Sequence, residues 1–426
     1  MATTDCGVDR QDLLRRLFDS AVATARPENC VPKYLPPAPK GQLIVIGAGK
    51  AAAAMARTLE DHWRGPMTGA VVTRYGYEVP TDQIEVLTAA HPVPDAASEA
   101  AARRMIDLCR SAGPDDLVLF LLSGGGSALL AAPAPGLTLA DKQAVTKALL
   151  ASGATIGEIN CVRRHLSAIK GGRLAALAFP AHILTLAISD VPGDDPAAIA
   201  SGPTVADPTT FADARAILDK YAISPPQAVA HHLQAATDET PKPGDKRLKS
   251  AEFKMIARPA EMLAAAAKEA ERAGYRIVNL GDALEGEARL IAADHAALAL
   301  GHAEAGEKVA ILSGGELTVT IAGTGRGGPN REYALALALA LAGDARITAI
   351  ACDTDGADGA PGPDGADVAG AIIGPDTLER AAALGLDGEK SLTDNDAGGF
   401  FEMLGEAVVT GPTRTNVNDF RAILVS

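Results

Sequence analysis

The sequence is poor in aromatic residues and cysteines, and it has no apolar run long enough to cross a membrane. Aromatic residues make up 4% of the 426 residues, and the five cysteines are scattered without a C-x-x-C pair. Such scattered thiols argue against a disulfide framework and against a zinc site. The apolar runs have the length of strands, well short of the roughly 20 residues that a membrane span needs. No apolar signal core follows the N-terminus, so we expect a cytoplasmic protein.

The charge balance is acidic, with a formal net charge of −14 at pH 7. This excess of carboxylates argues against binding to nucleic acid or to an anionic membrane surface. An anionic small molecule remains an acceptable ligand if basic residues cluster locally. The 47% of hydrophobic residues suffice for a large core, and the length of the chain predicts two domains. The oligomeric state stays open, with a homodimer as one option.

Strand-like and helix-like patterns alternate along the chain. Continuous apolar runs such as 42–48 and 116–123 are separated by alanine-rich helical stretches, which indicates a mostly parallel sheet covered on both faces. Residues 237–250 combine prolines, a glycine and charges, and they predict a linker. We therefore predict two α/β domains: a doubly wound, Rossmann-like domain over 1–236 and a smaller mixed α/β domain over 251–426. Small-molecule sites often lie between domains, so the active site is expected in the interdomain cleft.

A first glycine loop, GAGKAA at 47–52, follows a predicted strand and opens a predicted helix. It fits the loose dinucleotide fingerprint G-x-G-x-x-A, which favours an NAD(P)-dependent enzyme. That interpretation expects an acidic residue at the end of the second strand, where this chain has Arg74. Lys50 suggests another ligand, because a cation in the first turn of a helix opposes the helix dipole unless an anion lies over it. A tight structural turn is a third interpretation.

A second glycine loop, SGGGSALL at 123–130, frees the backbone to curl around a phosphate group. Its predicted phosphate ligands are two serines and the glycines between them: Ser123, Gly124, Gly125, Gly126 and Ser127. A related stretch, Ser313, Gly314 and Gly315, is followed by Glu316 in place of a third glycine. We assign these three residues to the same kind of ligand and Glu316 to magnesium, which carboxylates suit better than phosphate. A plain turn fits this second stretch better than the first.

Charged clusters follow further along the chain. Arg163 and Lys170 belong to a basic stretch that ends in Gly-Gly, where the carboxylate or phosphate of a small acid would fit. Asp190 and Asp195 follow a predicted buried strand, and carboxylates clustered there suggest Mg²⁺. Asp355 lies in a second acidic stretch of the same kind. The basic stretch also has a plainer interpretation as a solvated helix face.

Several motifs together resemble the class II glycerate 2-kinase family, whose members also carry the label hydroxypyruvate reductase of tartrate degradation. The matching segments, in chain order, are GAGKAA, SGGGSALL, VRRHLSAIKGGRL, SDVPGDDPAAIASGPT, SGGELTVTIAGTGRGGPNRE, DTDGADG and TGPTRTNVND. The resemblance covers nearly the whole chain. It implies a two-domain α/β kinase that uses ATP and Mg²⁺ to phosphorylate D-glycerate to 2-phosphoglycerate, with the two glycine stretches and Asp355 binding the nucleotide.

The resemblance places the active-site lysine of the family on Lys50 and an active-site arginine in a later glycine loop. The commoner form of that loop is Gly-Gly-Arg-Asn-Gln-Glu, whereas this chain has Pro329 in place of the arginine and Arg331 two residues later. Either Arg326 or Arg331 is expected to fill the role. We assign Arg331 to catalysis and both arginines to substrate binding.

Phosphoryl transfer depends on positioning and on neutralised charge. Lys50 and Arg331 are therefore predicted to stabilise the migrating phosphoryl group and hold the glycerate carboxylate, and Asp190 is the candidate general base. An NAD(P)H-dependent hydroxypyruvate reductase is the main alternative, favoured by the loop at 47–52. A non-catalytic sensor of glycerate or nucleotide is a further alternative, disfavoured by the charged residues present in all the loops.

Overall fold

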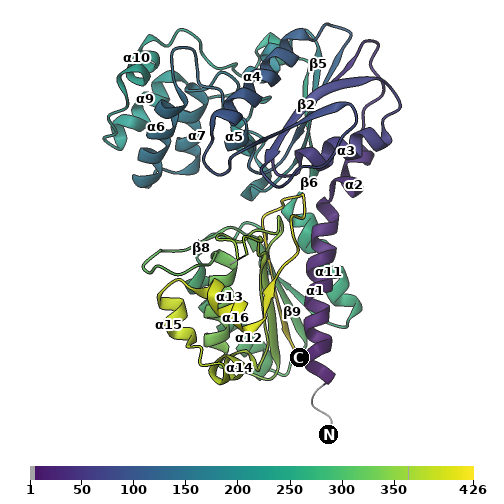
Figure 1. Ribbon diagram of the computed structural model, residues 1–426, viewed down its shortest axis with the longest axis vertical. Coiled ribbons are helices and arrows are strands. Elements are labelled where there is room, and N and C mark those ends of the chain that lie inside the picture. Colours follow the sequence, from purple (N-terminus) through teal and green to yellow (C-terminus); the bar gives the residue numbers. More distant parts are fainter. Residues whose placement is uncertain (1–4, 363) are drawn as a thin grey trace. The chain divides into compact units, whose positions relative to one another are not determined.

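The computed structural model describes residues 5–362 and 364–426, which form two compact units (Figure 1). One unit, residues 27–256, is called the loop unit here, and the other, the C-terminal unit, joins the chain up to Arg26 with residues 257–426. This division differs from the predicted boundaries. Helix α1 (Asp5–Ala25) packs against α11 (Pro259–Arg272), so it belongs to the C-terminal unit and not to the predicted first domain.

The segment predicted as a linker is docked onto the loop unit. The Asp238 carboxylate pairs with the Arg173 guanidinium, and Glu239 lies 2.9 Å from Nε2 of the buried His165. Strand β6 (Ala251–Ala257), which follows, forms the edge of the loop unit's sheet. The prolines and charges of 237–250 therefore mark a surface connection that the loop unit holds in place.

The loop unit is built on a six-stranded sheet in the order β3-β2-β1-β4-β5-β6. Its first five strands pair in parallel with their neighbours, which confirms the doubly wound prediction, and they are β1 (Leu43–Ala48), β2 (Met67–Arg74), β3 (Ile84–Ala89), β4 (Leu117–Leu122) and β5 (His182–Ile188). Every residue of β1 and β4 is buried, as continuous apolar runs require. Chain order reverses between β1 and β4, the point where such sheets place their ligands.

Helices of two groups accompany this sheet. The first group packs against the strands or lies at their ends, and it consists of α3 (Ala52–His62), α4 (Ala96–Ser111), α5 (Gly126–Leu129) and α8 (Arg173–Ala178). The second group has a hydrophobic cluster of its own and lies together at one side of the unit in Figure 1: α6 (Leu139–Ala151), α7 (Ile156–His165), α9 (Phe211–Lys220) and α10 (Gln227–Ala235). Shorter turns complete the unit: α2 (Pro27–Cys30), η1 (Val31–Tyr34), η2 (Pro192–Asp194), η3 (Ile199–Ser201) and η4 (Lys246–Leu248).

The C-terminal unit holds a mixed sheet, as predicted, in the order β13-β12-β11-β14-β9-β7. Its strands are β7 (Arg276–Asn279), β9 (Val309–Gly315), β11 (Ile347–Asp353), β12 (Gly370–Ile373), β13 (Ala407–Val408) and β14 (Asp419–Val425). Only β7 and β9 pair in parallel; the other pairs are antiparallel. Further helices are α12 (Ala288–Glu304), α13 (Pro329–Leu341), α14 (Thr377–Ala383), α15 (Gly388–Thr393) and α16 (Ala397–Leu404).

One predicted strand of this unit is mostly wrong. The sequence predicts a strand over 317–323, but only β10 (Leu317–Thr318) forms, paired with the equally short β8 (Gly286–Glu287). Beyond it the backbone N–H groups of Ala322 and Gly323 donate to the side chain of Asn395 at 2.8 and 2.9 Å. A side chain therefore satisfies backbone groups that a longer strand would have used.

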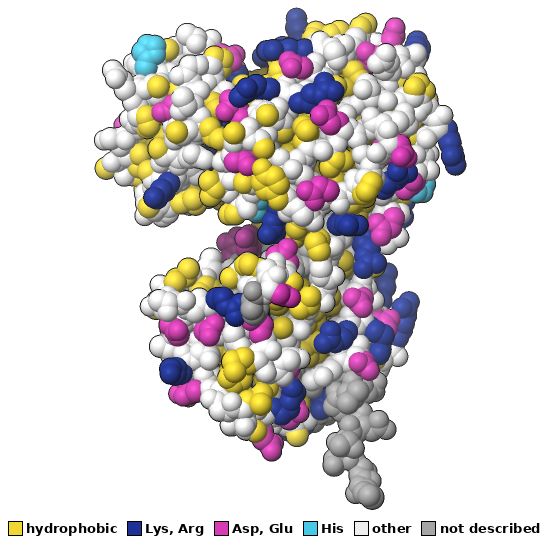
Figure 2. Space-filling view, in the orientation of Figure 1, with side chains coloured by type: hydrophobic (Ala, Val, Ile, Leu, Met, Phe, Trp, Pro, Cys, Tyr) yellow, Lys and Arg dark blue, Asp and Glu magenta, His cyan; other side chains and the backbone are white. Residues whose placement is uncertain are grey.

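Charges of both signs are interspersed on the face of the molecule that Figure 2 shows. That face has no broad basic patch of the kind that nucleic-acid binding needs. Among residues 5–362 and 364–426, none of the helices combines the length and the apolar character needed to span a lipid bilayer.

Candidate functional site

Two glycine loops lie side by side at the carboxyl-terminal ends of the two central strands of the loop unit's sheet. Strands β1 and β4 are parallel neighbours with Ala48 opposite Leu122. The loops that follow them therefore begin at the same end of the sheet's strands. Gly49 has a φ of +133°, and a Cβ there would lie 2.2 Å from Oγ of Ser123. Only glycine permits this approach. Gly49 therefore allows the first loop to pack closely against the second loop.

The backbone donors of the first loop are used inside the protein. Four consecutive N–H groups have protein acceptors: Gly49 to the Val72 carbonyl (3.1 Å), Lys50 to the Gly124 carbonyl (2.9 Å), Ala51 to Oγ of Ser123 (2.9 Å) and Ala52 to the Gly49 carbonyl (3.1 Å). A dinucleotide fingerprint offers such groups to the pyrophosphate. Here they are already satisfied. Ser123 is fully buried, and its hydroxyl accepts the N–H of Ala51, so it supports the first loop. Its role as a phosphate ligand stays a prediction.

The second loop keeps backbone donors available. Within the described part of the chain, no acceptor is found for the N–H groups of Gly124 and Gly125. Gly125 is left-handed, with a φ of +81°, and a Cβ there would lie 3.0 Å from Cδ2 of His91 and 3.5 Å from Cγ of Lys50. The half-buried Lys50 side chain therefore lies beside this turn. Two backbone N–H groups next to an ammonium group can bind the oxygens of a phosphoryl group.

Lys170 fixes the end of the same loop. Its Nζ donates to the carbonyl and the hydroxyl of Ser127 at 3.1 and 2.9 Å, and to the carbonyl of Ala200 at 3.1 Å. Burial, with a smaller effect of the cations Lys142 and Arg163, lowers the pKa of Lys170 well below its usual value. The protein occupies the donors of this lysine, so it positions the loop. The substrate contact of Lys170 stays a prediction.

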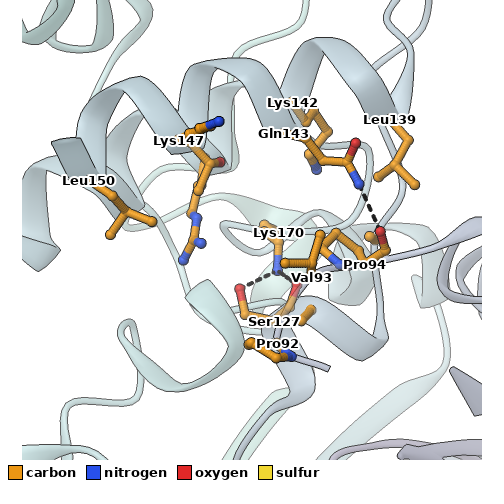
Figure 3. Close-up of a pocket in the computed structure, with 14 residues that line it drawn as sticks. Pro92, Val93, Pro94, Ser127, Leu139, Lys142, Gln143, Lys147, Leu150 and Lys170 are labelled. Carbon is orange, nitrogen blue, oxygen red and sulfur yellow. Dashed lines mark hydrogen bonds between the residues drawn. The ribbon is translucent and has the colours of Figure 1, made fainter. Parts of the chain in front are cut away.

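A cavity of about 510 Å³ opens beside Ser127 in the loop unit. Figure 3 shows helix α6 along one side of it, with Lys142, Gln143 and Lys147 on that helix. Ser127 and Lys170 lie on the other side, and Arg163 also lines the cavity. Residues predicted from two separate motifs, Ser127 from the second glycine loop and Arg163 with Lys170 from the basic stretch, are thus brought together at one cavity.

The acidic residues predicted as metal ligands do not form a complete site. Asp190 is half-buried and follows β5, the neighbour of β4. It therefore lies at the same end of the strands as the two glycine loops. Asp195 is exposed, and its carboxylate accepts the N–H of Ala197 at 2.9 Å. Within 5–362 and 364–426, no group of three or more His, Cys, Asp or Glu side chains could hold a metal ion. Mg²⁺ in kinases needs only one or two carboxylates beside the phosphates, so Asp190 fits such an ion and Asp195 fits less well.

The stretch from Ser313 to Gly315 is filled by the protein itself. Gly315 has a φ of +102°, and a Cβ there would lie 2.2 Å from the carbonyl oxygen of Leu284. The buried Arg421 donates to the carbonyls of Gly314 and Gly315 at 2.8 and 3.2 Å. These glycines admit the protein's own backbone and the Arg421 side chain. The nucleotide-binding role of this stretch stays a prediction.

The remaining predicted ligands of the C-terminal unit differ in exposure. Glu316 is exposed after β9, outside any metal-binding group among the described residues. Asp355 is fully buried, and its carboxylate accepts the N–H of Ala357 at 2.7 Å. This hydrogen bond stabilises a local turn. The contact of Asp355 with the nucleotide stays a prediction.

The two candidate arginines of the later glycine loop have different environments. Arg331 is 0% exposed, and its guanidinium binds the Asp358 carboxylate at 3.0 Å and the carbonyl of Ala360 at 2.6 Å. The side chain of Arg326 is 41% exposed and pairs with Glu402 at 2.7 Å. Arg331 is thus held inside the C-terminal unit by an ion pair, whereas Arg326 has exposed surface. The catalytic and substrate-binding roles of Arg331 stay predictions.

Sequence reasoning missed Lys142. It occupies the buried face of α6, at helical spacing from the core residues Val145 and Leu149. A lysine on the apolar stripe of a helix is the signal that could have found it, since lysine is rarely buried without a reason.

Comparisons with known proteins give a consistent family. The family model described as "Domain of unknown function (DUF4147)" matches residues 13–234, and the model described as "MOFRL family" matches residues 309–419. A protein of Agrobacterium vitis named putative hydroxypyruvate reductase is 51% identical over 425 residues, 98% of this chain and 95% of that protein. The glycerate 2-kinase of Pyrococcus horikoshii is 40% identical over 398 residues, 91% of this chain and 88% of that enzyme.

A solved structure agrees with these matches. The crystal structure of glycerate kinase from Thermotoga maritima superposes with a TM-score of 0.87 at 36% sequence identity, covering 98% of this chain and 100% of that one. The chain therefore belongs to the glycerate 2-kinase family, as the order of its motifs predicts.

Proposed function

We propose that this protein is an ATP-dependent glycerate 2-kinase that converts D-glycerate to 2-phosphoglycerate. Its similarity to the named kinases of Pyrococcus horikoshii and Thermotoga maritima supports this activity. The observation that carries it is the distribution of backbone donors at the two loops. The first loop's N–H groups have protein acceptors, whereas Gly124 and Gly125 keep theirs beside the Lys50 side chain.

The same observation weighs against hydride transfer from NAD(P)H, although relatives named putative hydroxypyruvate reductase are 51% and 50% identical. A dinucleotide would need the N–H groups that the first loop has already used. At the end of β2, where such sites hold the ribose with a carboxylate, Arg74 lies 5.1 Å from the ring centre of Tyr77. The fold is compatible with both chemistries, so the site and not the sheet order decides.

Each residue of the site has a role in this proposal. The Lys50 ammonium and the N–H groups of Gly124 and Gly125 bind oxygens of the transferred phosphoryl group and neutralise its charge. Lys170 holds Ser127, and thereby the loop, in position. Asp190 takes the proton of the glycerate hydroxyl or lies beside the metal. Mg²⁺, when bound with ATP, neutralises the phosphate oxygens.

The test is release of ADP from MgATP and D-glycerate, with the product offered directly to enolase and with NADH plus hydroxypyruvate in a parallel assay. We expect ADP formation and immediate use of the product by enolase, which identifies 2-phosphoglycerate. Consumption of NADH without ADP would instead establish the reductase. Ligand-induced thermal stabilisation without either reaction would establish a sensor.

Lys50→Met tests the residue on which the proposal depends. Removing a cation that stabilises the migrating phosphoryl group costs roughly a thousandfold or more in kcat. Lys40→Met is a matched control, because Lys40 is exposed and precedes the amino-terminal end of β1, the end opposite to the glycine loops. We expect Lys50→Met to lose turnover with an unchanged melting temperature and Lys40→Met to keep both. Near-normal turnover of Lys50→Met would contradict the role of Lys50.

A further inference from the structure

The cavity beside Ser127 gathers positive charge without a matching carboxylate. Lys142 of α6, Arg163 of α7 and Lys170 all line it, and Lys147 lies at its exposed side. No Asp or Glu is among the 14 residues that form its wall. This local excess of cations stands out in a chain with a net charge of −14.

Two of these cations have few partners in the protein. Lys142 is 8% exposed, and the acceptor found for its Nζ, the carbonyl of Ala132, lies 3.4 Å away. Arg163 is half-buried, and no ion pair or hydrogen bond of its guanidinium is found within the described residues. Buried charges are usually paired, because leaving water without compensation is costly. Lys142 and Arg163 therefore point to a ligand that supplies the negative charge.

The electrostatics of the cavity agree with this geometry. Burial, and to a smaller extent the charge of Arg163, lower the pKa of Lys142 to about 7, while Glu99 acts weakly in the opposite direction. Burial also lowers the pKa of Arg163. In the free protein the positive charges of Lys142, Arg163 and Lys170 repel one another. A multiply charged anion in the cavity would offset this repulsion.

The rest of the wall is apolar and large. Pro92, Val93, Leu139 and Leu150 contribute to it, and Gln143 is fixed by a hydrogen bond to the carbonyl of Pro94 (Figure 3). A volume of about 510 Å³ falls in the range of pockets for drug-sized ligands, which are mostly apolar with a few placed polar groups. A three-carbon acid would leave most of this space and most of these apolar walls without contact.

We propose that this cavity is the nucleotide site, with the phosphate chain against Lys142 and Arg163 beside the Ser127 loop and the nucleoside against the apolar wall. The inference rests on the proposed kinase function, which supplies the nucleotide. It assigns Arg163 to the nucleotide, adds Lys142 to the site, and leaves Lys50 with Gly124 and Gly125 for the transferred group.

The first experiment measures ADP binding by calorimetry to the full-length wild type and to Lys142→Met, Arg163→Met and Lys40→Met. Each cavity variant should bind ADP about tenfold more weakly or worse, as expected for a lost charge-assisted contact, and the Lys40→Met control should match the wild type. The KM for D-glycerate should not change. Because Lys142→Met removes a buried cation without a carboxylate partner, its melting temperature should not fall. Lys147→Glu, an exposed position, should also weaken ADP binding and does not depend on core packing.

A second experiment uses pyridoxal 5′-phosphate as an amine-reactive phosphate probe near neutral pH, with borohydride reduction and peptide mass spectrometry. We expect modification of Lys142 that ADP prevents and D-glycerate does not. Protection by D-glycerate, with a raised KM for that acid and unchanged ADP binding in the variants, would make the cavity the acid site and overturn the proposal. Unchanged ADP binding in all the cavity variants would also overturn it. If ADP binding is lost in the variants but no kinase activity is found in the wild type, the nucleotide site stands and the proposed function falls.

Discussion

Replacing Arg331 should unfold the C-terminal unit more readily and should not act through substrate binding. Arg331 is 0% and Asp358 2% exposed, and their charged groups are 3.0 Å apart. Removing one partner of a buried ion pair costs about 3–5 kcal/mol, because the other charge stays buried and unpaired. For a unit of this size, each kcal/mol corresponds to roughly 2–4 °C in melting temperature. Arg331→Met should therefore lower the melting temperature by roughly 6–20 °C.

Urea unfolding followed by circular dichroism measures this loss. The double variant Arg331→Met with Asp358→Leu should recover part of it, since both charges are then removed. Arg326→Met is the matched control in the same loop, because the Arg326 side chain is 41% exposed in its pair with Glu402, and ion pairs near the surface contribute about 0–1 kcal/mol. If Arg331→Met unfolds like the wild type and yet loses turnover, Arg331 is catalytic after all, and our structural interpretation of its burial is refuted.

Two further predictions concern stability. Gly49→Ala should destabilise the loop unit in thermal unfolding and abolish ADP formation, because the new Cβ would lie 2.2 Å from Oγ of Ser123 at a φ of +133°. Gly113→Ala is the control: its Cβ would lie 3.5 Å from its nearest contact, so it should be tolerated in the same assay. Burial lowers the pKa of His295 to about 4. Below about pH 6.5 the unfolded chain therefore binds a proton that the folded chain does not bind. As the pH drops from 6.5 to 4, this group should lower the free energy of unfolding by up to about 1.4 kcal/mol per pH unit. His295→Gln should flatten that slope in urea unfolding curves measured across the range, and an unchanged slope would show that the histidine is not the titrating group.

The core of the loop unit could be predicted from the sequence with nearly correct boundaries. The apolar runs at 42–48 and 116–123 are the strands β1 and β4, and a glycine loop follows each one. Continuous apolar strands and glycine turns are local signals, so no tertiary information was needed. What the loops contact was not local. Gly49 meets Ser123, 74 residues later in the chain, because β1 and β4 are neighbours in the sheet.

Long-range pairing explains most of what sequence reasoning missed. Helix α1 was expected in the first domain by its position in the chain, but its partner is α11. Strand β14 lies at the centre of the second sheet between β9 and β11, although polar, amide-rich residues precede it. The buried state of Arg331 depends on Asp358, 27 residues away in the chain, and no spacing rule connects them. Burial of a charged residue is a property of its partners, which a single sequence does not identify.

Glycine-rich stretches predict close approach, but they do not predict what approaches. A Cβ at Gly49 would collide with the Ser123 side chain and backbone, one at Gly315 with the backbone of Leu284, and one at Gly328 with Asp358 at 2.4 Å. In all three cases the protein fills its own loop. At Gly125 the nearest atoms belong to the side chains of His91 and Lys50, and the turn's backbone donors have no protein acceptor among the described residues. The turn at Gly125 is therefore the one among these four where the contacts leave a ligand as the natural partner, and it is the loop that we assign to the phosphoryl group.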